Sequence, residues 1–509
     1  MRRLAAFSAG ASLAYVLLEN IRLDWKFHHS VAAQPVTARL SSPTHLMLHT
    51  ALYVVRTLPQ LLLMRLIRSH PLGWSIQYEG MVRCISFSSR VGSFGAANGI
   101  LEAVATLSRM LLRCLHGSEI STKVPLLFTG KQKSHRRVEA AHARWVSPRA
   151  LPLGGTRAAL QRSRGVVLYC HGGGYCVGNA EMYLPEFISL AGMIEAELTL
   201  GGICSEDGTP PEVGVLSVEY TLSGAGGRIA PPLCFPRAIS DVVAAYTWLI
   251  DPAGGNVEPR RVVVSGDSAG GGLAVALLMH IRDHDLPAPA AAILISPWVN
   301  HIPTSGDTSS YARFAQHDYL DPSLVALFSA QYRGVAPEHG HVDAAALERK
   351  GAVATAGARE LLSRRQPEGE SSASKLSVDV DAEVEAVGLA PVSPHHRSIS
   401  AVQSGSRQGE DPCCVRGASF SGFPPCLVFA GGVEIFRDDV EALYSILKAA
   451  APTAGHELFV HENMVHVSPM LGALGSESAV GRRRMASFAA TKLVAAQGRK
   501  KKREVKDGA

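Results

Sequence analysis

The 509-residue chain has few charged residues, since Lys, Arg, Asp and Glu together make up only 18% of it. Hydrophobic residues make up 47%, so the chain can bury a large core, and this composition excludes a disordered protein. The net charge of +6 is small, and the run Arg499–Arg503 contributes much of the excess. The rest of the chain is therefore nearly neutral, which argues against a nucleic-acid-binding face.

The chain also lacks the cysteine patterns that are typical of disulfide-rich or zinc-binding proteins. Its nine cysteines are odd in number and irregularly spaced, and no C-x-x-C pair is present. Cys170 and Cys176 flank a glycine-rich stretch, and we interpret them as small buried hydrophobic residues. We therefore expect neither a structural metal site nor a disulfide framework.

The apolar runs near the N-terminus are poor candidates for a membrane-spanning helix, which needs about 20 apolar residues. Leu4–Leu18 is uncharged but short, and it follows two arginines. Leu46–Met64 is longer, but it contains a histidine, an arginine and a proline. These segments form either an amphipathic or buried helix pair or a membrane attachment. We favour membrane association, with the endoplasmic reticulum as one location and the cytoplasm as the alternative.

The most informative stretch is Val262–Gly272. Three valines predict a strand, a G-x-S-x-G motif follows, and a helix-forming run begins directly after it. This is the context of a nucleophile elbow, a sharp turn that lifts a serine hydroxyl out of the sheet edge at a helix N-terminus. The motif consists of Gly266, Asp267, Ser268, Ala269 and Gly270. Taken alone, it is equally compatible with a glycine-rich turn around an inert serine.

A second motif makes the inert turn a poor explanation. The apolar run Val166–Cys170 predicts a strand that leads into His171 and three glycines. Loops of this type supply oxyanion-hole N–H groups in lipases and esterases, because glycine lets the backbone approach a substrate carbonyl closely. The predicted oxyanion donors are the N–H groups of Gly172, Gly173, Gly174 and Ala269.

With these motifs the chain resembles the hormone-sensitive-lipase branch of the α/β-hydrolases, which includes arylacetamide deacetylases and fungal steryl acetyl hydrolases. The resemblance covers roughly residues 140 to 335 and 420 to 490. It implies a carboxylester hydrolase that acts on acyl or acetyl esters. The residues that carry it are His171–Gly174, Ser217–Tyr220, Pro236, Asp241, Gly266–Gly271, Ser296–Trp298 and Met464–Val467.

Candidate strands and helices alternate through the middle of the chain. Strands are predicted at 143–146, 166–170, 215–222 and 291–295, with a helix over 236–250. This alternation predicts an α/β fold with a doubly wound, mostly parallel sheet and helices on both faces. Residues 193–214 contain glycine and proline pairs, and we interpret them as a surface insertion.

Composition divides the chain into five segments. Residues 1–125 are predicted to form an N-terminal helical region, serving as a cap over the site or as a membrane anchor. Residues 126–336 are the first part of the hydrolase core, and 419–495 are the second. Between them, 337–418 are polar and of low complexity, which predicts a disordered insertion. Residues 496–509 form a basic tail.

In this fold an acid and then a histidine follow the nucleophilic serine. A predicted strand at 425–430 precedes Glu434, which stands where the resembled family carries its catalytic acid. Asp438 and Asp439 are alternatives, but they lie where a helix should begin, and acids are common in a first helical turn. We therefore prefer Glu434 to Asp438 as the acid of the triad.

The predicted base is His466, in a loop after a short strand near residue 460. His461 is the alternative, more simply explained as a surface or strand histidine. A triad of Ser268, His466 and Glu434 would cleave esters through an acyl-enzyme and needs no metal or cofactor. The expected partners are a small-molecule or lipid ester and a membrane, and not nucleic acid.

Two other functions stay open at this point. The protein could be a non-catalytic ligand-binding receptor, as in the plant gibberellin receptors, which resemble this family but lack the catalytic histidine. It could also be a membrane-associated interaction protein on the same fold. The presence of both Ser268 and His466 argues against the receptor.

Overall fold

The computed structural model describes residues 42–67, 72–117, 119–126, 142–204, 209–223, 235–301, 308–333, 419–472 and 476–507. The apolar run Leu4–Leu18 and the predicted insertion at 337–418 lie outside these residues. Most of both predicted parts of the hydrolase core, 126–336 and 419–495, lies within them.

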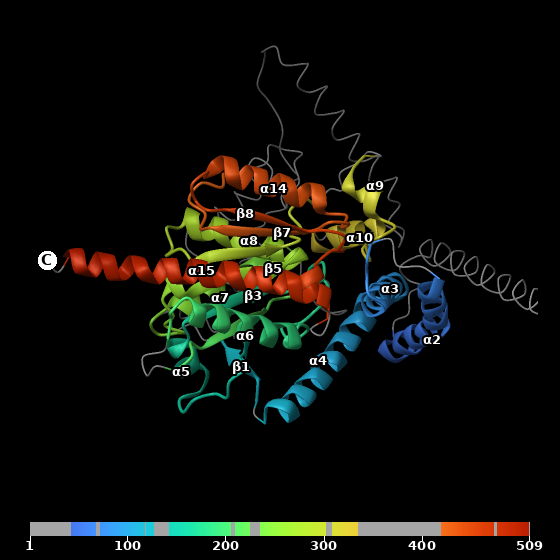
Figure 1. Cartoon of the computed structure of the whole chain (residues 1–509), viewed down its shortest axis with the longest axis horizontal. Coiled ribbons are helices and arrows are strands. Elements are labelled where there is room, and N and C mark those ends of the chain that lie inside the picture. Colours follow the sequence, from blue (N-terminus) through green and yellow to red (C-terminus); the bar gives the residue numbers. More distant parts are fainter. Residues whose placement is uncertain are drawn as a thin grey trace, which may run out of the picture.

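An eight-stranded sheet forms the centre of the described residues, in the order β1-β2-β4-β3-β5-β6-β7-β8 (Figure 1). β2 runs antiparallel to both of its neighbours, and all neighbouring pairs from β4 to β8 are parallel. The prediction of a mostly parallel sheet is therefore confirmed. The strands are β1 (Ser121–Pro125), β2 (His142–Val146), β3 (Gly165–Cys170), β4 (Val213–Glu219), β5 (Val262–Asp267), β6 (Ala291–Ile295), β7 (Cys426–Gly431) and β8 (Glu457–His461).

Helices cover both faces of this sheet, as the sequence predicts. Because side chains alternate along a strand, Val166 and Leu168 of β3 face one way, and Val167 and Tyr169 face the other. The first pair belongs to a core cluster with buried residues of α5, α7, α8, α10 and α14, and the second pair to a cluster with residues of α6 and α15. The α-helices are α2 (Pro43–Ile67), α3 (Ile76–Val91), α4 (Phe94–His116), α5 (Gly155–Arg162), α6 (Leu184–Leu200), α7 (Arg237–Ile250), α8 (Ser268–Asp283), α9 (Ser310–Phe314), α10 (Pro322–Tyr332), α14 (Arg437–Ala450) and α15 (Ser476–Asp507).

Two local predictions are wrong. Residues 193–200 are not part of a surface insertion but the second half of α6, where Ile194 and Leu198 are buried against the sheet. The glycines at 201 and 202 only end that helix. Ser121–Pro125 is the edge strand β1, with Val124 buried, so the sheet begins inside the region predicted to be helical through residue 125.

Helices α2 and α3 lie on the same side of the molecule as α9 and α10, and α4 runs from there toward the lower middle of the view (Figure 1). The ring of Phe94, at the start of α4, stacks on that of Phe328 in α10 with 5.0 Å between their centroids. In the described part of the chain, no helix combines the length and the apolarity needed to cross a membrane, and this includes α2, which contains the candidate Leu46–Met64.

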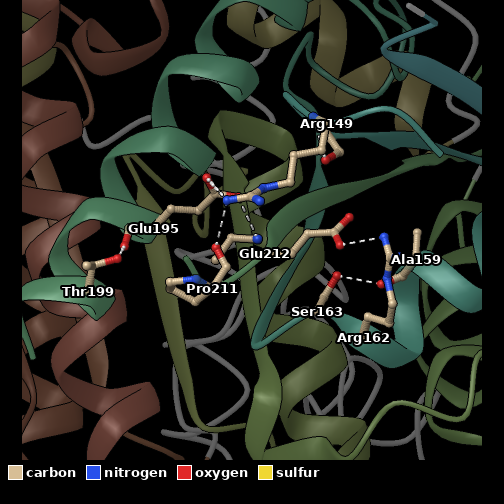
Figure 2. A network of polar contacts seen from close by, with 10 residues as sticks. Arg149, Ala159, Arg162, Ser163, Glu195, Thr199, Pro211 and Glu212 are labelled. Atoms are coloured by element: carbon tan, nitrogen blue, oxygen red, sulfur yellow. Dashed lines mark hydrogen bonds and ion pairs between the residues drawn. The ribbon is translucent and has the colours of Figure 1, made fainter. Parts of the chain in front are cut away.

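Ion pairs join the elements at the amino-terminal end of β4 (Figure 2). Glu195 of α6 pairs with Arg149 at 3.3 Å and accepts a hydrogen bond from the Val213 N–H at 2.9 Å. Arg162 of α5 pairs with Glu212 at 3.0 Å. These contacts stabilise the end of the sheet that lies opposite the carboxyl ends of the parallel strands.

Candidate active site

The carboxyl ends of β5, β7 and β8 carry the three predicted catalytic residues. Ser268 follows β5 directly, Glu434 comes three residues after β7, and His466 comes five residues after β8. These strands belong to the parallel part of the sheet, so their carboxyl ends lie at one edge. Open α/β sheets bind their ligands at this edge.

Ser268 sits on a strained turn between β5 and α8. Its φ of 53° lies in the left-handed region, which costs a residue with a side chain about 1–3 kcal/mol and is concentrated at functional sites. A side chain at Gly270 would lie 2.0 Å from the carbonyl oxygen of Cys170, so only glycine fits there. The strand, turn and helix are the context that the sequence predicts for a nucleophile elbow.

His466 and Glu434 form a buried pair. The imidazole Nδ1 lies 3.3 Å from Oε2 of Glu434, and both side chains are almost completely shielded from solvent. The other ring nitrogen, Nε2, is buried and has no hydrogen-bond partner among the described residues. The ring of Phe436 meets the imidazole edge-on at 5.0 Å. The structure therefore orients the imidazole through Nδ1 and leaves Nε2 available to accept a proton.

Burial disfavours the charged imidazolium of His466, but neighbouring acids outweigh this effect. The hydrogen bond to Glu434 and its charge, followed by the charges of Asp318 and Asp267, raise the pKa of His466 above its ordinary value of 6.5. The site therefore stabilises a positive charge on the imidazole. A histidine that takes a proton from serine needs this stabilisation, because it becomes an imidazolium.

The alternative acids point to other partners. Asp438 accepts a hydrogen bond from the Ser310 N–H and pairs with Arg313, both at 2.7 Å. Asp439 accepts from the side-chain amide of Asn300 at 3.1 Å. These carboxylates join α14 to neighbouring segments. Of Glu434, Asp438 and Asp439, only Glu434 contacts the imidazole of His466.

The alternative histidine, His461, also has another partner. It is the last residue of β8, and it is buried rather than on the surface. Its Nδ1 lies 3.0 Å from the Ser468 hydroxyl, and burial lowers its pKa to about 4. His461 is therefore a neutral histidine that holds the loop carrying His466.

The glycine loop after β3 lies against the serine turn. The N–H of Gly172 donates to Oδ1 of Asp267 at 2.9 Å, so it does not point toward a substrate as the sequence analysis predicts. Gly173 has a φ of 105°, which only glycine adopts readily, and its carbonyl oxygen accepts from the N–H of Cys176 and of Val177. This leaves Gly173 and Gly174, with Ala269 at the start of α8, as the candidate oxyanion donors.

Asp267, the residue before the serine, holds this loop in place. Besides Gly172, its carboxylate accepts hydrogen bonds from the hydroxyl groups of Tyr169 at 2.8 Å and Tyr183 at 3.0 Å. Burial raises the pKa of Asp267 to about 6, although these hydrogen bonds oppose the shift. The sequence singles out Asp267 only as part of a motif, and it gives no sign of the two tyrosines.

His171 is a structural member of the loop. Its ring stacks on that of Tyr220 at 4.3 Å, and the Tyr220 hydroxyl donates to the His171 carbonyl oxygen at 2.7 Å. Burial lowers the pKa of His171 to about 4, so the ring is neutral at physiological pH. Its role is to fix the path of the backbone into the three glycines.

The N-terminal helices contact both loops of the site. Asn98 of α4 accepts from the Gly178 N–H at 2.8 Å and donates to the Cys176 carbonyl oxygen at 3.2 Å, just after the glycine loop. The Trp74 indole N–H, just before α3, donates to the carbonyl oxygen of Asn463 in the loop that carries His466. Tyr78 packs with Val465, which adjoins His466.

Asp318 is a buried acid near His466 that the sequence gives no reason to single out. It lies between α9 and α10, is buried, and accepts hydrogen bonds from the backbone next to Glu434 and from that of His466. Its partners lie more than a hundred residues away in the sequence. In the sequence it is one of two acids shortly before α10, and an acid at such a position is expected to cap the helix.

Comparison with known families supports this fold. A family model described as alpha/beta hydrolase fold matches residues 203–387. That range includes Ser268 but begins after the glycine loop and ends before Glu434 and His466. A solved structure of an esterase from Pyrobaculum calidifontis is 18% identical with a TM-score of 0.51, covering 84% of this chain and all of that one, and it supports the fold alone.

Two curated relatives have named activities. An acetyl-hydrolase of Streptomyces hygroscopicus is 34% identical over 184 residues, which are 36% of this chain and 52% of that protein. An arylacetamide deacetylase of Bos taurus is 30% identical over 173 residues, 33% of this chain and 37% of that protein. The chain thus spans about half or less of the length of these relatives.

Proposed function

We propose that this chain, which has an α/β-hydrolase fold and is similar to acetyl-hydrolases and arylacetamide deacetylases, is a serine carboxylester hydrolase that cleaves acyl or acetyl esters. The observation that carries the proposal is the buried pair of His466 and Glu434, at the same sheet edge as the strained turn of Ser268. A receptor or a scaffold has no need of an imidazole held in this way.

The proposed reaction uses the chain's own residues. His466 Nε2 takes the proton of the Ser268 hydroxyl as its oxygen attacks the ester carbonyl, and Glu434 stabilises the resulting imidazolium. The N–H groups of Gly173, Gly174 and Ala269 bind the oxyanion. The alcohol leaves with a proton from His466. Water, activated by the same imidazole, then releases the acid from the acyl-enzyme.

The test is covalent labelling with a fluorophosphonate, which reacts with activated serines. We expect the wild-type protein to be labelled and to hydrolyse p-nitrophenyl acetate, and Ser268→Ala to do neither while keeping its melting temperature. Ser445→Ala, which changes an exposed serine on α14, is the control and should behave as wild type. Labelling or turnover that persists in Ser268→Ala would exclude this serine as the nucleophile, and an unlabelled, inactive wild type would favour the receptor or scaffold.

The domain organisation also forms part of the proposal. Helices α2–α4 serve as a cap, which is supported by the contacts of Asn98 and Trp74 with the two loops of the site. Residues 337–418 are an insertion in the hydrolase core. The core then includes β1 in addition to the predicted segments 126–336 and 419–495.

We further propose that the enzyme works at a lipid surface, bound through exposed faces of α2 and α4. The exposed apolar residues of each helix recur at spacings of three, four and seven, which places them on one face. Exposed arginines, Arg56 on α2 and Arg113 on α4, could contact anionic headgroups. The apolar residues are Met47, Leu48, Leu52, Val55, Leu58 and Leu62 on α2, and Val104, Leu107, Met110, Leu111 and Leu115 on α4.

Sedimentation with vesicles of phosphatidylcholine and phosphatidylserine tests this surface. We expect the wild-type protein to bind, and Leu52→Asp with Val55→Asp to weaken binding by about tenfold or more, because each burial of such a side chain contributes about 1.5–3 kcal/mol. Leu153→Asp is the control, since Leu153 is fully exposed in a loop far along the chain. Equal loss in both variants, or no binding by wild type, would contradict the proposal.

A further inference from the structure

Asp318 is a buried acid for which the proposed reaction has no role. Only 4% of its surface is exposed, although its carboxylate would be strongly solvated in water. A carboxylate is buried at an acceptable cost only where hydrogen bonds replace its water. Its hydrogen-bond partners therefore indicate what the residue does.

Both carboxylate oxygens of Asp318 accept from backbone N–H groups. Oδ2 accepts from Ile435, the residue after Glu434, at 2.9 Å. Oδ1 accepts from Tyr319 at 2.8 Å and, at the longer distance of 3.4 Å, from His466 itself. One side chain thus joins the loop after β7, which carries the acid, to the loop after β8, which carries the base.

We propose that Asp318 is a positioning residue that fixes the separation of Glu434 and His466 and adds a negative charge beside the imidazole. This inference rests on the proposed function. The 3.3 Å contact between His466 Nδ1 and Glu434 Oε2 joins two side chains from different loops. Since Asp318 holds the backbone of both loops, losing it allows them to separate, and a shift of about 1 Å at an active site can cost about 100-fold in rate.

The charges around the imidazole predict a second effect. The acids that face His466 are Glu434 after β7, Asp318 before α10 and Asp267 at the end of β5, and all three favour the imidazolium. The Tyr319 ring lies 5.9 Å from the imidazole. Burial raises the pKa of Asp318 to about 6. Because this value is still below 7, the carboxylate is mostly ionised at neutral pH. Removing this charge lowers the pKa of His466, and the acid limb of the kcat/KM profile moves to lower pH.

Two variants separate position from charge. Asp318→Asn removes the charge and one acceptor, and we expect kcat to fall between about 10-fold and about 100-fold with KM little changed, together with an acid limb at lower pH. Asp318→Glu keeps the charge but moves the carboxylate by one methylene, so kcat should fall while the acid limb stays at the wild-type pH. If Asp318 were purely structural, the two variants would not differ in whether the acid limb moves.

Asp321→Asn is the matched control. Asp321 lies three residues away and caps α10 by accepting from the Ser323 N–H at 2.8 Å. Its loss should lower the melting temperature without changing kcat or the acid limb. All rates are normalised to the fraction of protein that the fluorophosphonate labels, so that unfolded protein does not count.

A folded Asp318→Asn protein with wild-type kcat and an unmoved acid limb would overturn the inference. So would failure of both Asp318 variants to fold while Asp321→Asn folds, because Asp318 would then serve the fold and not the site. Failure of the proposed function is seen separately, in a wild-type protein that neither hydrolyses esters nor takes the label, and the role of Asp318 falls with it.

Discussion

At the scale of single residues, the carboxylate of Glu434 can be tested against its neighbour on α14. Glu434→Gln keeps the shape of the side chain but removes the charge that orients His466, and we expect kcat to fall by about 10⁴-fold, as for the aspartate-to-asparagine change in a serine protease. Asp438→Asn should cost only about 1 kcal/mol of stability, because Asp438 contacts Ser310 and Arg313 and not the imidazole.

Both proteins are compared by turnover of p-nitrophenyl acetate and by thermal melting under the same conditions. An inactive Asp438→Asn with an active Glu434→Gln would place the acid one helical turn later. If neither substitution mattered, Asp439 or a residue outside this loop would have to orient His466.

The pH dependence of activity follows from the raised pKa of His466. The imidazolium cannot accept the serine proton, so kcat/KM should fall as pH decreases through the pKa of the folded enzyme, which lies above the ordinary value of 6.5. In Glu434→Gln the residual activity should decline at a lower pH, since the main group that raises this pKa is gone. An acid limb that stays in place in that variant would mean that another group controls it.

The residue scale also shows what the sequence can predict about the site. Ser268, Glu434 and His466 can be proposed as a triad from the sequence because each follows a predicted strand in a known order. The prediction of the Gly172 N–H as an oxyanion donor was wrong, because its hydrogen-bond acceptor, Asp267, lies 95 residues away in the sequence and comes near only when β3 and β5 are adjacent. Asp318 was missed for the same reason, as its interactions exist only in the folded chain.

At the scale of elements, the ion pairs at the start of β4 allow a test far from the chemistry (Figure 2). Glu195→Ala leaves the Val213 N–H without its acceptor, which should cost about 1–3 kcal/mol. Glu195→Gln keeps an acceptor and should cost less. Thermal melting measures both, and kcat should stay at the wild-type value, because these residues lie at the opposite end of the sheet from Ser268. A large loss of kcat in the folded Ala variant would contradict this separation.

The elements that the sequence mispredicts have weak local signals. The second half of α6 precedes two glycines and a proline pair, which are typical of loops. In the sequence this loop signal is stronger than the helical spacing of Ile194 and Leu198, the two residues that the structure buries. β1 has only five residues, Ser121–Pro125, of which two are buried, so its strand character comes from pairing with β2. By contrast, β3 was predicted within one residue, and β5 begins with the three valines that predict a strand, although it continues to Asp267.

At the scale of the whole molecule, the insertion predicted at 337–418 can be removed. Deleting residues 345–410 should leave the fold and the esterase activity largely intact, because this segment contains too little apolar sequence to belong to a core. Soluble yield, thermal melting and turnover measure the outcome. Complete loss of folded protein would show that the segment contributes to the core or to its assembly.

The two sequence segments of the hydrolase core, before and after residues 337–418, meet in the sheet where β6 pairs with β7. The first part contains Ser268 and the second part Glu434 and His466, while α15 from the second part packs on α6 of the first. A chain cut between them would form its active site by association of two polypeptides. Its activity would then follow the law of mass action, rising with the concentration of both fragments, and neither fragment alone would turn over an ester.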